Sequence, residues 1–552
     1  MKNIFFILLV IVLLGNPFIS FSQSTQGFFL NDNQPKKVFI PKSKKIKNTT
    51  AEAIVKVEVN VMDTIATVSK YLFGNNTNPY MTQIVTESKL LEQIQTLSPN
   101  ILRFPGGNIS NTYFWDAFPN HKPADVPDTI LYGDKRKPKP ERIWVGRNDN
   151  PNSLSLENYY KLLQQTNSTG TICVNAGYAR YGTSNNPIAT AAHYAANWVR
   201  YDKGRTKFWE VGNEDYGTWQ AGYKIDVSKN KDGQPEITSD ELYGKIFKVF
   251  SDSMHAAAKE RGAEIHVGAT IIELPKTNKW DTDVDRNWNS GFFKSAKNTA
   301  DFFIIHSYYT QYNQNSTPEV ILATATTVTN KMMQYMKDIT ERNNVLLKPI
   351  ALTEWNIFAE GSKQQTSYIN GMHATIVLGE LAKNKYGMAC RWDLANGYAN
   401  GNDHGMFNKG DEPNMPKWSA RPVYYYMYYF QKFFGDKIIT GSSSDESVLV
   451  YASSFSDGKK GLVLINKDTS DKTISIHFNH QKNKGNFYGY TLTGGNDNGL
   501  FSQKVLINGV ESSLPAGGPD DFESIKAWSS SFENDMKITL PARAVQYILI
   551  DK

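Results

Sequence analysis

The feature that most constrains this fold is an alternation, between residues 71 and about 400, of short apolar runs with longer amphipathic segments. The runs have the length and the β-branched or aromatic content of strands. The strand candidates are 71–74, 101–104, 171–175, 207–211, 265–269, 302–306, 350–353 and 388–392. The segments between them, such as 156–165 and 239–261, have helical periodicity. Eight strands that alternate with helices predict an α/β fold, a (β/α)8 TIM barrel over residues 71–421.

A different pattern begins near residue 422. Short apolar runs at 448–451, 461–465, 473–478, 489–492 and 544–550 are separated by turns rich in Asp, Asn and Gly. Such closely spaced strands predict an antiparallel β-sandwich domain over residues 422–552. Residues 54–70 begin with one further run of alternating apolar and polar residues, which predicts a strand with one buried face.

The N-terminus has the features of a secretory signal peptide, which we place at residues 1–22. Lys2 precedes the apolar run 4–14, and small residues surround the expected cleavage site. The run is too short to span a bilayer, so we expect a secreted or periplasmic protein with no membrane attachment after signal cleavage. Residues 23–53 carry several lysines and little periodicity, so we expect an extended, solvated N-terminal arm.

The composition of the chain limits the classes of partner that it can bind. A formal net charge of +6 over 552 residues is small, and no basic stripe is interleaved with aromatic residues, so we expect no nucleic acid partner. Aromatic residues make up 12% of the chain; they pack cores, but they also stack on sugar rings. Cys173 and Cys390 lie in apolar runs and are expected to be buried; the sequence leaves open whether they pair.

Two glutamates mark the ends of distant strand candidates. Glu214 ends the string 209–214 (Trp-Glu-Val-Gly-Asn-Glu), and Glu354 lies in the string 351–356 (Ala-Leu-Thr-Glu-Trp-Asn). Each alone is compatible with an ordinary solvated or salt-bridged Glu. Together they suit glycoside hydrolysis, which uses one carboxyl group as proton donor and a second carboxylate as nucleophile. A parallel barrel brings such strand ends together at its C-terminal rim.

Other strand ends carry polar or aromatic residues that fit a substrate site. Arg103, after the second strand, is suited to hold a carboxylate ionised, and the glycine pair before Asn108 permits close backbone approach to a ligand. A long insert, 108–155, follows and is expected on the catalytic rim. We interpret His306 as a positioning group and Trp392 as a sugar platform. The predicted substrate-binding residues are Arg103, Asn108, Asn213, Trp219, His306, Tyr308 and Trp392.

On these motifs the chain resembles the retaining glycosidases of clan A, and most closely the α-L-arabinofuranosidases of glycoside hydrolase family 51. The motifs are 102–108 (Leu-Arg-Phe-Pro-Gly-Gly-Asn), 209–220 with its Gly-Asn-Glu and Gly-Thr-Trp-Gln, 306–308 and 353–356. The resemblance implies that Glu214 is the acid/base and Glu354 the nucleophile. It also implies that the strand within 54–70 joins the C-terminal sandwich.

One departure affects the substrate. The family has a Glu after the first strand that contacts arabinose hydroxyls, whereas residues 73–79 (Phe-Gly-Asn-Asn-Thr-Asn-Pro) contain no carboxylate.

From the motifs and the resemblance together we predict a secreted retaining hydrolase of cell-wall polysaccharide, α-L-arabinofuranosidase-like, with an oligo- or polysaccharide as substrate. An endo-acting β-glycanase of the same clan and, more remotely, a non-catalytic carbohydrate-binding protein are the alternatives. We expect no metal and no cofactor. The sugar, its linkage and the oligomeric state are left open.

Overall fold

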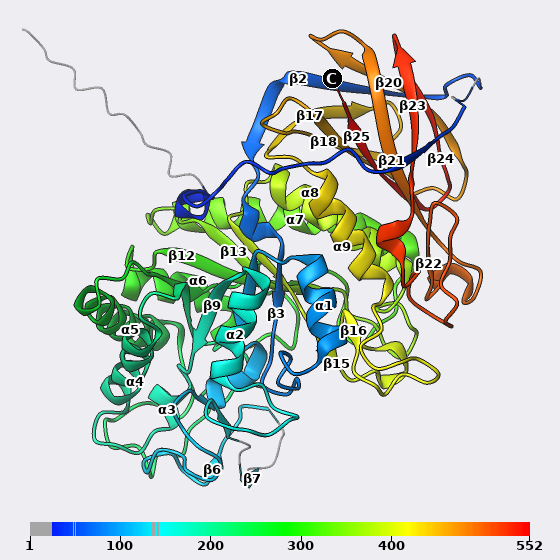
Figure 1. Cartoon of the computed structure of the whole chain (residues 1–552). Helices are drawn as coiled ribbons and strands as arrows, with labels where there is room; N and C mark the ends of the chain where they lie inside the picture. Colours follow the sequence, from blue (N-terminus) through cyan, green and yellow to red (C-terminus); the bar gives the residue numbers. More distant parts are fainter. Residues whose placement is uncertain (1–24, 48, 50, 135–138, 141–142, 552) are drawn as a thin grey trace, which may run out of the picture.

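The computed structural model describes residues 25–47, 49, 51–134, 139–140 and 143–551, so the signal peptide predicted for 1–22 lies outside the described residues. Figure 1 shows a barrel surrounded by helices and, beside it, a curled β-sheet. α8 (Tyr368–Lys383) and α9 (Pro422–Phe433) lie between these two bodies and contact strands of the sheet. This arrangement confirms the predicted fold class.

The barrel found in the described residues is closed by parallel strands in the order β10-β11-β12-β13-β14-β3-β4-β9. These strands are β3 (Gly74–Asn76), β4 (Ile101–Phe104), β9 (Thr169–Val174), β10 (Thr206–Val211), β11 (His266–Thr270), β12 (Phe302–Tyr308), β13 (Ile350–Asn356) and β14 (Met388–Arg391). The bounds agree with the sequence prediction to within a few residues. The first strand differs most, because Tyr71 lies in the 3₁₀ helix Lys70–Leu72 and pairing with β4 begins only at Gly74.

The interior of the barrel has an apolar layer and, further along the same strands, a polar layer. Side chains two residues apart on a strand share a face, so a strand can contribute to both layers. The apolar cluster includes Ile101, Phe208, Phe302, Ile304, Ala351 and Met388. Two residues beyond Ile101, Phe208 and Ile304 come the buried polar residues Arg103, Glu210 and His306. The candidate site therefore lies directly above a well-packed core.

The helices around the barrel begin at ordinary capping residues. Ser155, Ser239, Thr282 and Thr317 each accept a hydrogen bond from a backbone N–H in the first turn of the helix that follows. Besides α8 and α9, the long helices are α1 (Ser88–Leu97), α2 (Leu156–Thr166), α4 (Pro187–Asp202), α5 (Asp240–Glu260), α6 (Asp283–Ala296) and α7 (Pro318–Arg342).

The expected change of pattern at residue 422 does not open the sheet domain: residues 422–433 form α9, a helix that packs beside α8 and α1. Nearly all its side chains are buried, because α9 also contacts β19 and β25 of the sheet. A helix that is buried over most of its surface has only a narrow polar stripe, which makes it hard to recognise as a helix in the sequence. The sheet begins with β17 (Lys437–Ser443).

The sheet contains eleven strands among the described residues, in the order β1-β23-β21-β25-β19-β18-β17-β2-β20-β24, with β22 paired to β21. It includes β18 (Val448–Ser454), β19 (Lys460–Asn466), β20 (Lys472–Asn479), β21 (Lys484–Gly494), β22 (Val505–Ile507), β23 (Ala527–Glu533), β24 (Met536–Leu540) and β25 (Ala544–Ile550). β2 (Val55–Thr67) pairs with β17 and, in parallel, with β20. Side chains such as Val57, Leu462 and Ile476 form the buried core of this curled sheet.

The segment expected as a solvated arm is partly buried, which corrects that expectation. The 3₁₀ helix Gly27–Leu30 places Phe29, fully buried, against Tyr71, Phe208 and Phe302 at the apolar end of the barrel. Further along, β1 (Ser43–Lys45) pairs with β23, although its lysines remain exposed. Two phenylalanines among polar residues gave too short an apolar run for this role to be read from the sequence.

Cys173 and Cys390 are both buried and both free, and burial raises the pKa of the Cys173 thiol. The question that the sequence left open is therefore answered: the two thiols do not form a disulfide. Among the described residues, no helix combines the length and the apolar character needed to cross a membrane.

Candidate active site

Glu214 and Glu354 lie together at the C-terminal end of the barrel. Glu354 belongs to β13, and Glu214 follows β10 by three residues. A carboxylate oxygen of each lies within 4.8 Å of the other and of a ring nitrogen of His306. In glycosidases the two carboxyl groups are about 5–5.5 Å apart for retention and about 6.5–9.5 Å apart for inversion. The close approach therefore suits a carboxylate that attacks the sugar directly.

A local irregularity in β13 turns Glu354 toward the site. Leu352 pairs with Ile305 of β12, but the next pair is Glu354 with His306, so Thr353 is an extra residue on β13. Such bulges redirect the side chains that follow them. Glu354 is buried, and its two oxygens accept hydrogen bonds from different donors: Oε1 from Arg103 at 2.8 Å and Oε2 from Tyr308 at 3.0 Å. The carboxylate is thus fixed in both position and rotation.

Arg103 is the centre of a buried network. Its Nε donates to Glu210 Oε2 at 2.8 Å, its Nη1 to Glu354 and Asn76, and its Nη2 to Asn213 Oδ1 at 2.9 Å. Burial alone disfavours a charged guanidinium, but the charges of Glu210 and Glu354 outweigh this effect and raise the pKa of Arg103. Arg103 therefore stays protonated while it contacts Glu354.

Glu210 is a site residue that the sequence analysis missed. Its side chain is completely buried, and Arg103 is its ion-pair partner. The signal was present: an acidic residue inside an apolar strand needs a buried cation, since an unpaired carboxylate is too costly to bury. Arg103, expected from the sequence to hold a carboxylate, was the obvious candidate for that cation.

Glu214 is held by His306 and Trp219. His306 Nδ1 lies 3.0 Å from Glu214 Oε1, and Trp219 Nε1 donates to Oε2 at 2.9 Å. Burial on its own would raise the pKa of Glu214, but the hydrogen bond and charge of His306, the Trp219 N–H and Arg103 together lower it. For His306, burial works toward a lower pKa, while Glu354 and Glu214 raise it above its ordinary value. Each of the two groups therefore favours the charged form of the other.

The backbone at Glu214 is also unusual. Its φ is +47°, in the left-handed region that few residues other than glycine adopt. Such conformations cost on the order of 1–3 kcal/mol and concentrate at functional sites. Here the turn directs Glu214 toward His306 rather than along the strand.

The remaining predicted residues take different places. Asn213 contacts Arg103, but its side-chain NH₂ has no partner among the described residues. Asn108 is exposed in the 3₁₀ helix Gly107–Thr112, whereas Asn111 of the same helix is buried and donates to Asn213 O and Asp215. Part of the insert 108–155 thus contacts the loop that carries Glu214.

Trp392 is half-buried against the glycine pair. A Cβ added at Gly106 or Gly107 would lie within 2.8 Å of the indole ring. The glycines therefore make room for Trp392, and the expectation that they bring backbone to a ligand is revised accordingly.

Glu214, His306 and Glu354 are the one group in the described part of the chain with the spacing of a metal site. Arg103 already places a positive charge 2.8 Å from Glu354, which opposes binding of a divalent cation beside it. The arrangement suits proton transfer and nucleophilic attack better than metal ligation.

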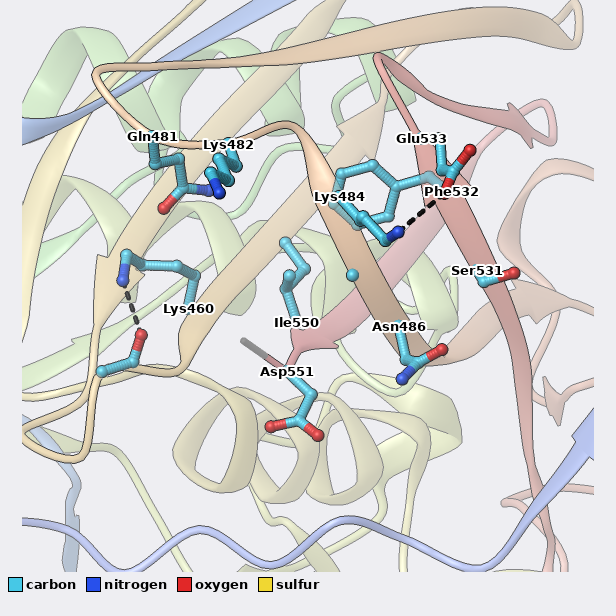
Figure 2. Close-up of a pocket in the computed structure, with 12 residues that line it drawn as sticks. Lys460, Gln481, Lys482, Lys484, Asn486, Ser531, Phe532, Glu533, Ile550 and Asp551 are labelled. Carbon is cyan, nitrogen blue, oxygen red and sulfur yellow. Dashed lines mark hydrogen bonds and ion pairs between the residues drawn. The ribbon is translucent and has the colours of Figure 1, made fainter.

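A hollow of about 990 Å³ lies on the sheet domain (Figure 2). It is lined by side chains such as Lys482, Asn486 and Phe532, and Lys484 and Glu533 form an ion pair across part of it. It contains no pair of buried carboxylates, so its size alone does not make it the candidate site.

A (β/α)8 barrel with a pair of glutamates at the ends of its fourth and seventh strands is the architecture of clan A glycoside hydrolases. The comparisons agree with this class. The family model described as alpha-L-arabinofuranosidase 1 domain matches residues 93–320, a segment that includes Glu214 but ends before Glu354. Over residues 93–320 the chain is therefore similar to an arabinofuranosidase domain.

Individual relatives support the same resemblance. A probable alpha-L-arabinofuranosidase C of Aspergillus clavatus is 24% identical over 309 residues, which cover 52% of this chain and 54% of that protein. The alignments span from about a quarter to about half the length of the first curated relatives. An alpha-L-arabinofuranosidase from Thermotoga maritima, solved as an arabinose complex, has a TM-score of 0.62 at 16% identity and covers 90% of this chain and 100% of its own. A family 44 xyloglucanase from Paenibacillus polymyxa has a TM-score of 0.56 at 14% identity, covering 90% and 99%. At such identities the structural likeness concerns the fold.

Proposed function

We propose that the protein is an exported retaining glycoside hydrolase of cell-wall polysaccharide, with α-L-arabinofuranoside as the preferred glycone. The observation that carries the proposal is the close approach of the Glu214 and Glu354 carboxylates around His306. The arabinofuranosidase domain match supports the choice of glycone. The signal-like residues 1–22 support export, which N-terminal sequencing of the mature protein would test.

In the proposed first step, Glu354 attacks the anomeric carbon and the glycosidic bond breaks. Glu214 delivers its proton to the leaving oxygen, and a covalent glycosyl-enzyme remains. Glu214 must be protonated to act as the acid, and His306, whose Nδ1 lies 3.0 Å from Glu214 Oε1, is placed to pass a proton to it. In the second step Glu214 removes a proton from water, which attacks the same carbon and frees Glu354.

Arg103 and Tyr308 prepare Glu354 for this attack. Both are buried or nearly so, and each binds a different oxygen of the carboxylate. A fixed nucleophile pays less orientational entropy when it reaches the reacting carbon. The same two donors stabilise the carboxylate when it leaves in the second step.

Paired variants test these roles on aryl glycosides. Glu354→Ala should abolish turnover on every substrate, since no covalent intermediate can form. Glu214→Ala should lose far less on 4-nitrophenyl arabinofuranoside than on an alkyl glycoside, because a good leaving group needs little protonation. Azide should then partly restore turnover of the Glu214→Ala variant. Equal losses on good and poor leaving groups would contradict the acid/base role of Glu214.

An endo-acting β-glycanase is the second candidate, supported by the family 44 structures that share the fold. Product analysis separates the two. Arabinose released from arabinan or arabinoxylan supports an arabinofuranosidase, whereas oligosaccharides from a β-glycan, without hydrolysis of aryl arabinofuranosides, would establish the endo-glycanase. A carbohydrate-binding protein without activity would show neither product, but the intact pair of carboxylates argues against it.

A further inference from the structure

A second open hollow, separate from the candidate active site, lies on the sheet domain. It measures about 870 Å³ and is lined by residues of β1 and β23 at one edge of the curled sheet and of β24 at the other. Residues of β21 and β25 line it as well. The hollow therefore lies where the two edges of the sheet approach one another, and we call it the Trp528 hollow after its largest side chain.

Trp528 of β23 is held in a fixed orientation at the wall of this hollow. It pairs with Gly489 of β21, and a Cβ added at Gly489 would lie 2.2 Å from the indole ring. The glycine therefore lets the ring lie across the strand. The indole Nε1 donates to Thr491 Oγ1 at 3.1 Å, two residues further on the same face of β21. Part of the ring stays exposed, so the hollow has a preorganised aromatic surface.

The Trp528 hollow is also positively charged. Its described lining includes four exposed lysines and no Asp or Glu; the lysines are Lys44, Lys47, Lys526 and Lys537. Other lysines of this domain are paired, such as Lys484 with Glu533 and Lys504 with Glu511, but no ion pair within the described residues involves these four. Like charges that lack a counter-charge repel one another, and an anionic ligand relieves that repulsion.

An exposed indole beside several cations suits a polymer that combines apolar ring faces with regular negative charge. The C–H face of a sugar ring stacks on an indole, and a uronic acid adds a carboxylate within reach of the lysines. Single-stranded nucleic acids also combine stacking with negative charge. The choice of a sugar polymer rests on the proposed function of the barrel, whereas the presence of a site for an anionic polymer does not.

We propose that the Trp528 hollow is a non-catalytic binding site for a polysaccharide that carries uronic acid. Trp528 stacks on a sugar ring, and the lysines bind the carboxylates of the same chain. The site holds the protein on an acidic polymer while the barrel acts on bonds elsewhere. Because binding here requires neither Glu214 nor Glu354, failure of this inference and failure of the proposed function are measured separately.

The test compares two ligands that share a backbone and differ in charge. The full-length Glu354→Ala variant, in which the proposed hydrolysis is blocked, is titrated with polygalacturonate oligosaccharides and with their methyl esters. We expect the acid form to bind at least about 10-fold more tightly at low salt, because several lysines each contribute a modest amount. The preference should shrink as the salt concentration rises from about 0.05 M to about 0.5 M, since exposed charges are screened.

Two variants place this binding in the Trp528 hollow. Trp528→Ala should weaken binding of the acid form by at least about 10-fold, as is common for a tryptophan at the centre of an interface. The double variant Lys526→Glu/Lys537→Glu should weaken it by at least about 10-fold as well, and its exposed positions keep the test valid if Trp528→Ala does not fold. The matched control is Lys245→Glu/Lys248→Glu, which makes the same change of charge on the exposed face of α5 and should bind as the parent does.

Three outcomes would overturn the inference. They are equal binding of the acid and its ester by the parent, unchanged affinity in a folded variant of the hollow, and tighter binding of a single-stranded DNA oligonucleotide of similar length. If wild type hydrolyses no glycoside but the acid form binds as expected, the proposed function fails and the binding site stands.

Discussion

Replacing Glu210 tests whether the buried Arg103 network controls the nucleophile. Glu210→Gln keeps the shape of the side chain and an acceptor for Arg103 Nε, but it removes one of the two carboxylates that balance the guanidinium. At 2.8 Å the charge–charge term is about 6 kcal/mol with an effective dielectric constant of about 20. Relief of the desolvation of Glu210, several kcal/mol, offsets much of it. We expect a net loss of about 1–3 kcal/mol of stability.

The kinetic consequence follows from the geometry. With Glu210 neutral, Glu354 is the carboxylate that must balance the charge of Arg103. The guanidinium then stabilises the Glu354 carboxylate more strongly, so this carboxylate attacks the sugar less readily. We expect kcat on aryl glycosides to fall by about 10- to 100-fold, equivalent to about 1.4–2.7 kcal/mol of barrier. Glu210→Ala, which breaks the buried pair outright, should cost about 3–5 kcal/mol of stability.

Thermal unfolding and steady-state kinetics measure the two effects, with Glu380→Gln as a control for loss of a buried carboxylate elsewhere. Glu380 is held by Tyr451 and Asn330 and has no contact with Arg103. A Glu210→Gln variant with wild-type Tm and wild-type kcat would refute the reasoning. A loss of stability with unchanged kcat would restrict the network to a structural role.

Other perturbations have equally definite outcomes. The charge of Glu354 and the hydrogen bond and charge of Glu214 raise the pKa of His306, so the alkaline limb of the pH–rate profile should lie above pH 6.5. In His306→Asn only Glu214 remains to hold the proton, so the alkaline limb of the profile should move to lower pH. An unchanged limb would mean that another group determines it. Phe29→Ala should lower the free energy of unfolding by about 3–5 kcal/mol, because the Phe29 ring is fully buried among Tyr71, Phe208 and Phe302. A Tm equal to that of wild type would show that the N-terminal segment does not close the barrel in solution.

Much of the fold could be predicted because barrel strands are short, apolar and regularly spaced. The limits lay where tertiary contacts override local pattern. α9 is buried over most of its surface between barrel and sheet, so its run of tyrosines leaves only a short polar stripe at Gln431 and Lys432. Phe28 and Phe29 give no periodic signal, because a single 3₁₀ turn suffices to place a ring against the barrel.

For the site, residue types could be predicted but partners could not. Arg103, Glu214, His306 and Glu354 were found because strand ends of a parallel barrel converge. Which acid contacts Arg103 depends on the register of β9 with its two neighbouring strands. Arg103 of β4 pairs with Thr171 of β9, whereas Glu210 of β10 pairs with Cys173, two residues further along β9. The bulge at Thr353, which aligns Glu354 with His306, likewise leaves no mark in the sequence.

The same geometry explains why the residues that bind one another come from distant parts of the chain. Several strands, among them β4, β10 and β12, contribute a polar inward position above the apolar layer, and a single buried charge there would be prohibitively costly. Arg103 resolves this by contacting Glu210, Glu354 and two asparagines at once. Stability and nucleophile placement therefore depend on the same guanidinium. A lysine keeps the positive charge but cannot reproduce the planar fork that reaches both carboxylates at once, so we expect Arg103→Lys to lose activity even where it folds.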